Sequence, residues 1–205
     1  MTNPALQLAG SLLFGFVCGS VPFGWLAGRL RRLDIRQHGS GNIGFANVQR
    51  TMGWKWALPV LLLDSAKGAL AVLFSWQIGL QPVPAGLGAV CGHIYTPWLR
   101  FNGGKGVATT LGVAAVLFPR ALLAGLLLYL IILLASGFVS LASLCFALLL
   151  VPLVAALYPS RPDLLFAAAG SAVLIILRHR ANLSRLIQGS EPRLTLWLRI
   201  FQRRS

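Results

Sequence analysis

The sequence predicts an all-α polytopic membrane protein with seven transmembrane helices, and three observations support this. Hydrophobic residues fill 57% of the 205 positions and the mean hydropathy is +0.76, too apolar for a soluble domain of this length. The apolar residues form long runs without the alternation of a β-barrel. The charged residues lie mainly in the links between these runs. Residues 1–205 are therefore expected to form a single transmembrane domain.

The expected spans follow the apolar runs and the turn residues between them, with roughly 20 residues needed for each crossing. They are residues 4–28, 54–80, 85–94, 107–118, 121–135, 141–158 and 164–177. The third and fourth runs are short for a full crossing. Two alternatives stay open for them: their ends continue into the links, or their backbone is re-entrant around a polar cavity.

The distribution of basic residues predicts the orientation of the chain in the membrane. The chain has 18 Lys+Arg against 4 Asp+Glu, a formal charge of +14. With the first residue outside, all the basic residues except Arg120, Arg161 and Lys67 fall on the cytoplasmic side. The positive-inside rule therefore predicts an outside N-terminus and a cytoplasmic C-terminus. This topology explains the basic excess without nucleic acid as a partner, and it also suits an anionic substrate.

The first polar motif runs from Gly39 to Arg50 and is predicted to be a loop that holds a phosphate. Glycines let backbone N–H groups approach an anion closely, and arginine supplies a planar fork of donors. The alternative is an ordinary polar turn between two membrane helices. The candidate substrate contacts in this motif are Gly39, Ser40, Gly41, Asn42, Gly44, Asn47 and Arg50.

The second polar motif is a glycine-rich link before the fourth span, and it is also predicted to bind a phosphate. Gly103, Gly104 and Gly106 are expected to offer free backbone donors at the start of a helix, beside the charge of Lys105. A simple glycine turn with a positive-inside lysine is the alternative. His93, shortly before this link, is expected to orient substrate or accept a proton, although a structural hydrogen bond is an equal alternative.

Two further groups of polar residues follow in the second half of the chain. Ser136, Ser140 and Ser143 would share one face if that stretch were one helix. Ser143 is taken as a substrate contact, and serine packing between membrane helices is the alternative. Near the end of the chain, His179 and Asn182 have the spacing to reach the same phosphate, although a plain basic flank to the last helix is the alternative.

Charged residues inside a span indicate an ion pair or a polar interior. Asp64 and Lys67 lie within the second expected span, where an isolated charge costs about 2.5–3.5 kcal/mol or more. Their spacing of three residues predicts a salt bridge. The acids Asp34, Asp64, Asp163 and Glu191 are scattered, which argues against a metal site and against a two-carboxylate hydrolase. No metal site is therefore expected, and the sequence gives no reason to expect a cofactor.

Taken in order, these motifs resemble the PlsY family, the bacterial acyl-phosphate:glycerol-3-phosphate acyltransferases of the inner membrane. The resemblance runs almost from end to end. At positions 45 and 46 the family usually has Ala-Thr, whereas this chain has Phe45 and Ala46, so one hydroxyl is missing. The matching residues are Gly39 to Gly44, Asn47, Val48, Arg50, Leu63, Asp64, Lys67, Gly68, Gly92, His93, Phe101, Gly103 to Thr109, Arg178 to Arg180, Asn182, Arg185, Leu186 and Glu191.

The resemblance implies seven transmembrane helices and an active site that is open to the cytoplasm. It implies transfer of a fatty acyl group from a long-chain acyl phosphate to the 1-hydroxyl of glycerol 3-phosphate, giving lysophosphatidic acid and phosphate. We assign Ser40, the backbone of residues 41–44, Asn47 and Lys105 to the acyl phosphate. Arg50, Ser143, His179 and Asn182 are assigned to glycerol 3-phosphate.

The expected catalytic residues are Ser40, Arg50, Lys105, His179 and Asn182, and the leaving phosphate itself is expected to take the proton. His93 as general base is the rival hypothesis. A membrane transporter of a phosphorylated metabolite is the alternative function, although the chain shows no internal repeat. A membrane-surface helix in the tail beyond Glu191, including Leu194, Trp197 and Phe201, is also plausible.

Overall fold

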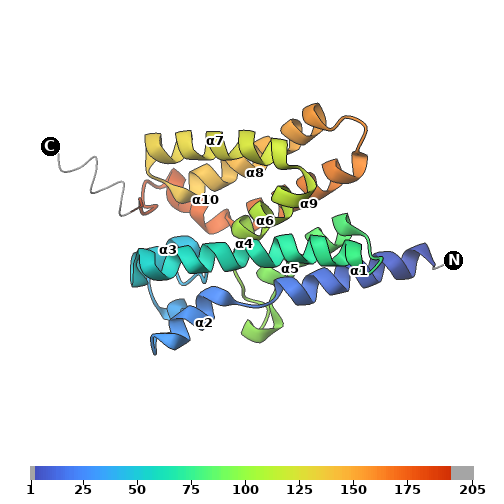
Figure 1. Cartoon of the computed structure of the whole chain (residues 1–205). Helices are drawn as coiled ribbons and strands as arrows, with labels where there is room; N and C mark the ends of the chain where they lie inside the picture. The colour runs from blue at the N-terminus through green and yellow to red at the C-terminus, as the bar shows by residue number, and fades with distance from the viewer. Residues whose placement is uncertain (1–2, 195–205) are drawn as a thin grey trace.

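The computed structural model describes residues 3–194, and every regular element in that range is helical. Many large hydrophobic side chains are exposed on the surface, most of them on helices, as expected for lipid-facing helices. Figure 1 shows two layers, with α1, α4 and α5 in one and α7 to α10 in the other. Helix α6 lies between them. The helices are α1 (Pro4–Gly19), α2 (Phe23–Leu30), α3 (Phe45–Met52), α4 (Trp54–Gln77), α5 (Pro82–Ile94), α6 (Val107–Leu117), α7 (Pro119–Ser136), α8 (Val139–Leu157), α9 (Pro162–Arg178) and α10 (Arg180–Ile187), with 3-10 turns at Ile35–Gln37 and Pro97–Leu99.

Each of the seven expected spans contains a helix, but the helices differ in length. Within the described residues, four segments are long and apolar enough to cross a membrane: Pro4–Leu30, Trp54–Gln77, Pro119–Ser136 and Val139–Leu157. A fifth exists if α9 and α10, which meet at a bend of 58°, form one broken span. Helix α5 has 13 residues and α6 has 11, which are about 20 and 16 Å of helix. Seven complete crossings and the orientation of the termini therefore stay predictions.

The first expected span is interrupted. Helix α1 ends at Gly19 and α2 begins at Phe23, because Pro22 cannot continue the hydrogen bonding of the helix. The motif from Gly39 to Arg50 is likewise not one loop. Its second half is helix α3, so Asn47 and Arg50 project from a helix.

Small residues let the helices around the site pack closely. A Cβ atom at Gly15 or Gly19 of α1 would collide with the backbone of α5 at Ala85 or Ala89. The same holds for Gly68 of α4, which lies against the backbone of Thr109 in α6. Close backbone contacts of this kind drive helix association in membranes, where lipid removes the usual hydrophobic driving force. They fix α5 and α6, whose connecting link carries Lys105.

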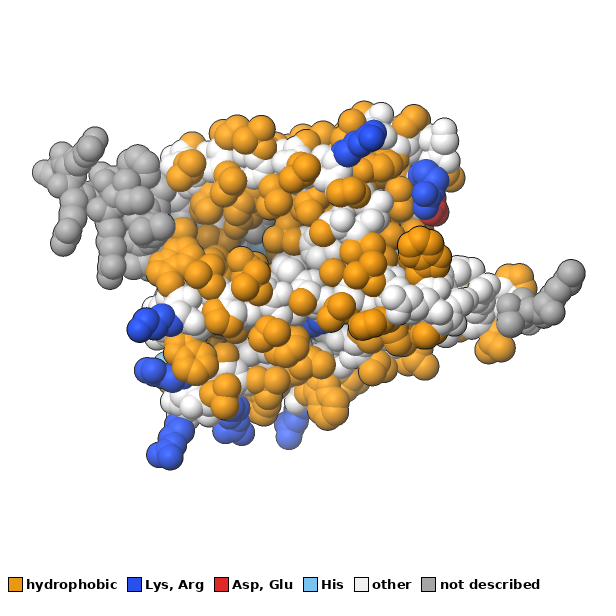
Figure 2. Space-filling view, viewed as in Figure 1, with side chains coloured by type: hydrophobic (Ala, Val, Ile, Leu, Met, Phe, Trp, Pro, Cys, Tyr) orange, Lys and Arg blue, Asp and Glu red, His pale blue; other side chains and the backbone are white. Residues whose placement is uncertain are grey.

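The basic residues gather unevenly on the surface. Figure 2 shows Lys and Arg concentrated at the end of the molecule near α2 and α3, with a smaller group and an acidic residue at the opposite end. At that opposite end, Arg161 pairs with Asp163 at 2.7 Å, which offsets one of the two positive charges expected outside. This distribution supports the predicted orientation. The tail residues Trp197 and Phe201 lie outside the described residues, so the predicted surface helix is not tested.

Candidate active site

A cavity of about 350 Å³ lies between the two layers and has one polar and one apolar part. Figure 2 shows the hollow between the layers, with an imidazole visible inside it. The apolar part is formed by α4, α6 and α7, including Leu61, Leu111, Leu126 and Leu130. Of the residues predicted from the sequence, the cavity wall contains Ser40, Asn42, Gly44, Asn47, Arg50, His93, Lys105, Gly106, Ser143, His179 and Asn182.

On one side of the cavity, Asn47 organises the loop before α3. Its Oδ1 accepts the N–H of Ser40 at 2.9 Å, and its Nδ2 lies 2.8 to 3.2 Å from the carbonyl oxygens of Ile35, His38 and Asn42. Asn47 is buried, and its amide is therefore used inside the protein. Gly39 adopts a positive φ of 58°, and a Cβ there would collide with Asn47 Oδ1. Asn47 and Gly39 thus shape the loop that presents Ser40.

The loop leaves the start of α3 open toward the cavity. The N–H groups of Gly41 and Gly44 are used by His38 O and Asn42 Oδ1. Helix α3 has no side-chain cap, and its first residues Phe45 and Ala46 line the cavity. The first N–H groups of a helix and its dipole together favour an anion. This wall of the cavity therefore suits a phosphate.

The second glycine motif holds its lysine in place and does not offer all the donors expected from the sequence. Gly103 N–H donates to Ile94 O at 2.9 Å and Gly104 N–H to His93 O at 3.1 Å. The expectation of free N–H groups is therefore wrong at these two positions, neither of which lines the cavity. Arg178 donates to the carbonyl oxygens of the same two glycines at 3.2 and 3.3 Å. A Cβ at Gly104 would collide with the His93 ring, so only glycine fits there.

The predicted salt bridge in α4 is confirmed and includes His93. Lys67 Nζ lies 2.8 Å from Asp64 Oδ1 and also donates to Val21 O at 2.7 Å. His93 Nδ1 lies 3.4 Å from the same carboxylate oxygen. All three side chains are buried, and Asp64 and His93 line the cavity whereas Lys67 does not. Lys67 thus has a structural role, and His93 contacts both α4 and the second glycine motif.

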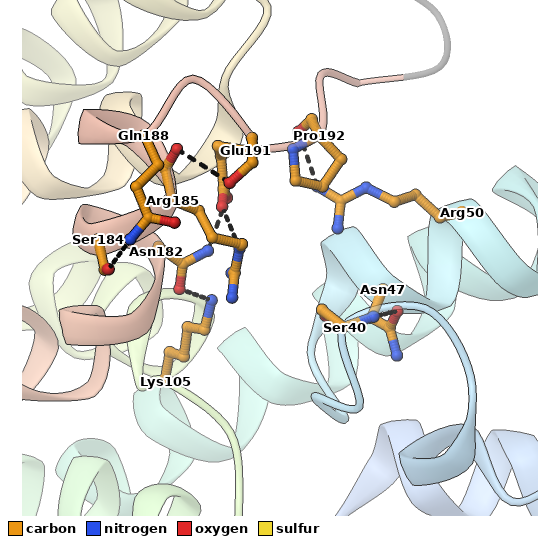
Figure 3. A network of polar contacts seen from close by, with 11 residues as sticks. Ser40, Asn47, Arg50, Lys105, Asn182, Ser184, Arg185, Gln188, Glu191 and Pro192 are labelled. Atoms are coloured by element: carbon orange, nitrogen blue, oxygen red, sulfur yellow. Dashed lines mark hydrogen bonds and ion pairs between the residues drawn. The ribbon is translucent and has the colours of Figure 1, made fainter.

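A hydrogen-bonded network holds Lys105 on the opposite wall. Lys105 Nζ donates to Asn182 Oδ1, and Asn182 Nδ2 donates to Glu191 Oε1 at 2.6 Å. Arg185 Nε donates to the other carboxylate oxygen of Glu191 at 2.7 Å. Figure 3 shows this network facing Ser40, Asn47 and Arg50 across an open space. Arg50 donates to Pro192 O at 3.3 Å, and its Nε has no hydrogen-bond partner in residues 3–194.

Burial changes the protonation of two groups in the network. It lowers the pKa of Lys105 to about 8, because the charge loses water and lies near Arg185 and Arg50, although Glu191 opposes this. Burial and nearby Lys105 lower the pKa of His179 to about 4. His179 Nδ1 lies 2.8 Å from Ile175 O, which can only accept. At neutral pH the neutral ring therefore has its proton on Nδ1, and Nε2 is an acceptor.

The serines at the start of α8 are only partly as predicted. Gly137 has a positive φ of 75° and ends α7, so Ser136 does not share a helix with the other two serines. Ser140 and Ser143 are buried in α8 and line the cavity.

Sequence reasoning also missed Trp54 and Tyr129 in the cavity wall. Trp54 packs edge-to-face on Phe45 at 5.7 Å between ring centroids, and neither aromatic belongs to a polar motif that would have revealed it.

Comparisons with known proteins identify the family of the chain. Residues 9–189 match the family model described as glycerol-3-phosphate acyltransferase. Proteins of that name from Trichlorobacter lovleyi and Paramagnetospirillum magneticum are 41% and 46% identical, over 94% and 92% of this chain and 98% and 94% of their own. The crystal structure of PlsY (YgiH), an integral membrane glycerol 3-phosphate acyltransferase, matches in its glycerol 3-phosphate form with a TM-score of 0.85 and 36% identity, covering 95% of this chain and 98% of that chain. Its lysophosphatidic acid form matches with a TM-score of 0.81 and 37% identity, covering 91% and 94%.

The pKa of Lys105 predicts how anion binding depends on pH. A lysine with a pKa of about 8 is charged below pH 8 and loses its charge above it. The dissociation constant of sulfate, whose own charge is constant, should rise about tenfold between pH 7 and pH 9 at fixed ionic strength, because the charged fraction of Lys105 falls by that factor. Titration calorimetry measures this. Lys105→Arg should show less than about a twofold change, since arginine stays charged; a flat curve for the unmodified protein would contradict the assignment.

Proposed function

Because this chain belongs to the glycerol-3-phosphate acyltransferase family, we propose that it transfers a fatty acyl group from a long-chain acyl phosphate to the 1-hydroxyl of glycerol 3-phosphate. The observation that carries the proposal is the two-part cavity. Its polar part has cationic groups on two facing walls, Arg50 on α3 and Lys105 before α6, and its apolar part continues along α7. One substrate would fill both parts and the other only the polar part.

The two walls suit two phosphates. Ser40, the start of α3 and Lys105 would hold the phosphate of the acyl donor, where negative charge grows as it leaves. Arg50, His179 and Asn182 would hold glycerol 3-phosphate, and Ser143, whose hydroxyl donates to Val139 O at 2.8 Å, would accept from one of its hydroxyls. Neutral His179 suits a hydroxyl of the glycerol unit, because its Nε2 accepts a hydrogen bond. Holding both substrates in one site replaces a bimolecular encounter and contributes about 7–11 kcal/mol to lowering the barrier.

The proposed chemistry needs no base from the protein. The glycerol oxygen bonds to the acyl carbon, the bond from that carbon to the phosphate oxygen breaks, and the leaving phosphate takes the hydroxyl proton. A phosphate group has a second pKa of about 6, whereas the pKa of His179 is about 4, so the phosphate is the better proton acceptor near neutral pH. His93 is buried against Asp64 and Gly104, which supports a positioning role for it.

The proposed location is the bacterial inner membrane, with the active site toward the cytoplasm. Helices α3 and α10, which form the polar part of the cavity, lie at one end of the molecule (Figure 1). The concentration of Lys and Arg is at the same end (Figure 2). The positive-inside rule favours that end as the cytoplasmic one. Glycerol 3-phosphate is a charged, water-soluble metabolite and would then reach the cavity from the cytoplasm.

Phosphate release by the purified protein tests the proposed reaction. Release should require palmitoyl phosphate and glycerol 3-phosphate together, and Lys105→Ala should reduce it at least about 100-fold, because the leaving phosphate loses its cation. Lys55→Ala is the matched control, since Lys55 is exposed and outside the cavity. Acyl transfer from acyl-CoA without acyl phosphate would overturn the proposed donor. No transfer from either donor would favour a transporter.

His93→Gln tests the absence of a protein base. We expect kcat within about threefold of the unmodified protein and the same pH profile, because a glutamine amide can replace the contact of the imidazole with Asp64. The surface variant His38→Gln provides the comparison. Loss of a general base would instead lower kcat by about 10²–10⁴ and remove the acid limb of the profile. That result would restore His93 as the base.

A further inference from the structure

Tyr129 is a polar residue in the cavity wall to which the proposed reaction gives no role. It lies in α7, whose other residues between Arg120 and Ser136 are all apolar. It lines the cavity beside Leu126, Leu130 and Leu133 of the same helix. Polar groups inside a membrane span are costly and commonly functional. Its position therefore requires a partner for the phenol group.

The protein partner of the phenol is Ser143 on α8, which the Tyr129 hydroxyl faces. The hydroxyl of Ser143 already donates to Val139 O at 2.8 Å. Since a serine hydroxyl has only one proton, its oxygen can only accept from Tyr129. Tyr129 lines the cavity, so its phenol proton can be donated to a bound ligand.

Tyr129 also lies where the two parts of the cavity meet. Its hydroxyl faces the polar Ser143 of α8, and the apolar Leu126 and Leu130 of α7 line the cavity beside it. An acyl phosphate has its carbonyl group between the phosphate and the hydrocarbon chain. When its phosphate is at the polar part and its chain lies along α7, the carbonyl comes to this boundary.

We propose that Tyr129 donates a hydrogen bond to the acyl carbonyl oxygen and stabilises the negative charge that builds there during transfer. This inference rests on the proposed acyl transfer and adds a residue to it. As the glycerol oxygen bonds to the acyl carbon, the electron pair of the carbonyl moves onto its oxygen, which the phenol donor stabilises. The pair returns when the bond to phosphate breaks. Tyr129 keeps its proton throughout, and the phosphate takes the proton of the hydroxyl.

The variant Tyr129→Phe tests this role, because it removes the donor and keeps the ring that packs against the cluster around Phe146 and Leu150. We expect kcat to fall about 10²-fold, with the KM for glycerol 3-phosphate within about twofold. The matched control is Tyr158→Phe. Tyr158 accepts the N–H of Arg120 at 3.2 Å at the other end of α7, away from the cavity, and its loss should leave kcat unchanged.

Inhibition by hexadecyl phosphate separates this role from simple packing, because this molecule has the phosphate and the chain but no carbonyl. Its inhibition constant should be the same for Tyr129→Phe and the unmodified protein. An unchanged kcat in Tyr129→Phe would overturn the inference. A rise in the inhibition constant of hexadecyl phosphate by the same factor as the loss in kcat would also overturn it. If the unmodified protein transferred no acyl group, the proposed function itself would fail, which is a distinguishable result.

Discussion

The hydrogen-bonded chain from Glu191 through Asn182 to Lys105 joins three parts of the molecule that are distant in sequence. Glu191 belongs to the segment after α10, Asn182 to α10 itself, and Lys105 to the link between α5 and α6. Lys105 lies near several arginines, and burial further disfavours its charge. Glu191 is the acid that offsets this repulsion. One carboxylate therefore offsets part of the repulsion among these cations, and the remaining positive charge is available to bind anionic ligands.

The buried pair of Asp64 and Lys67 supports the cavity wall that contains Lys105, through His93 and Gly104. Asp64 contacts His93, His93 packs against Gly104, and Gly104 precedes Lys105. The link lies close against the end of α5, because Gly104 leaves room for the imidazole and the N–H groups of Gly103 and Gly104 donate to Ile94 O and His93 O. The position of Lys105 is thus fixed from α4 and α5 on one side and from α9 and α10 on the other, with Arg178 bonded to the link.

Sequence reasoning succeeded where local chemistry determines the result. Charges three residues apart in an apolar run had to pair, and Asp64 and Lys67 do. Lys105, expected at the phosphate of the acyl donor, lines the same cavity as His179 and Asn182, which were expected at glycerol 3-phosphate. Sequence reasoning failed where contacts between distant segments determine which groups are free to bind a ligand. The amide groups of Asn47 and of Gly103 and Gly104 are used inside the protein, which depends on segments that only the fold brings near.

The lengths of the helices show the same limit. The apolar runs located α4, α7 and α8 to within a few residues, because long runs are unambiguous. They did not reveal the break before α2 or the helix α3 inside the first polar motif. Tyr129 was also overlooked, because one tyrosine in a span has no pattern around it. Its significance comes from its place in the cavity wall and from its neighbour Ser143 on the next helix.

The central claim is that both phosphates occupy one cavity at the same time, and a matrix of initial velocities tests it most directly. The concentrations of palmitoyl phosphate and glycerol 3-phosphate would be varied together and the release of phosphate measured. Intersecting double-reciprocal lines, which indicate a ternary complex, are the predicted result. Parallel lines would indicate that phosphate leaves before glycerol 3-phosphate binds, through a covalent acyl-enzyme. That result would contradict the account and would require a nucleophile on the protein.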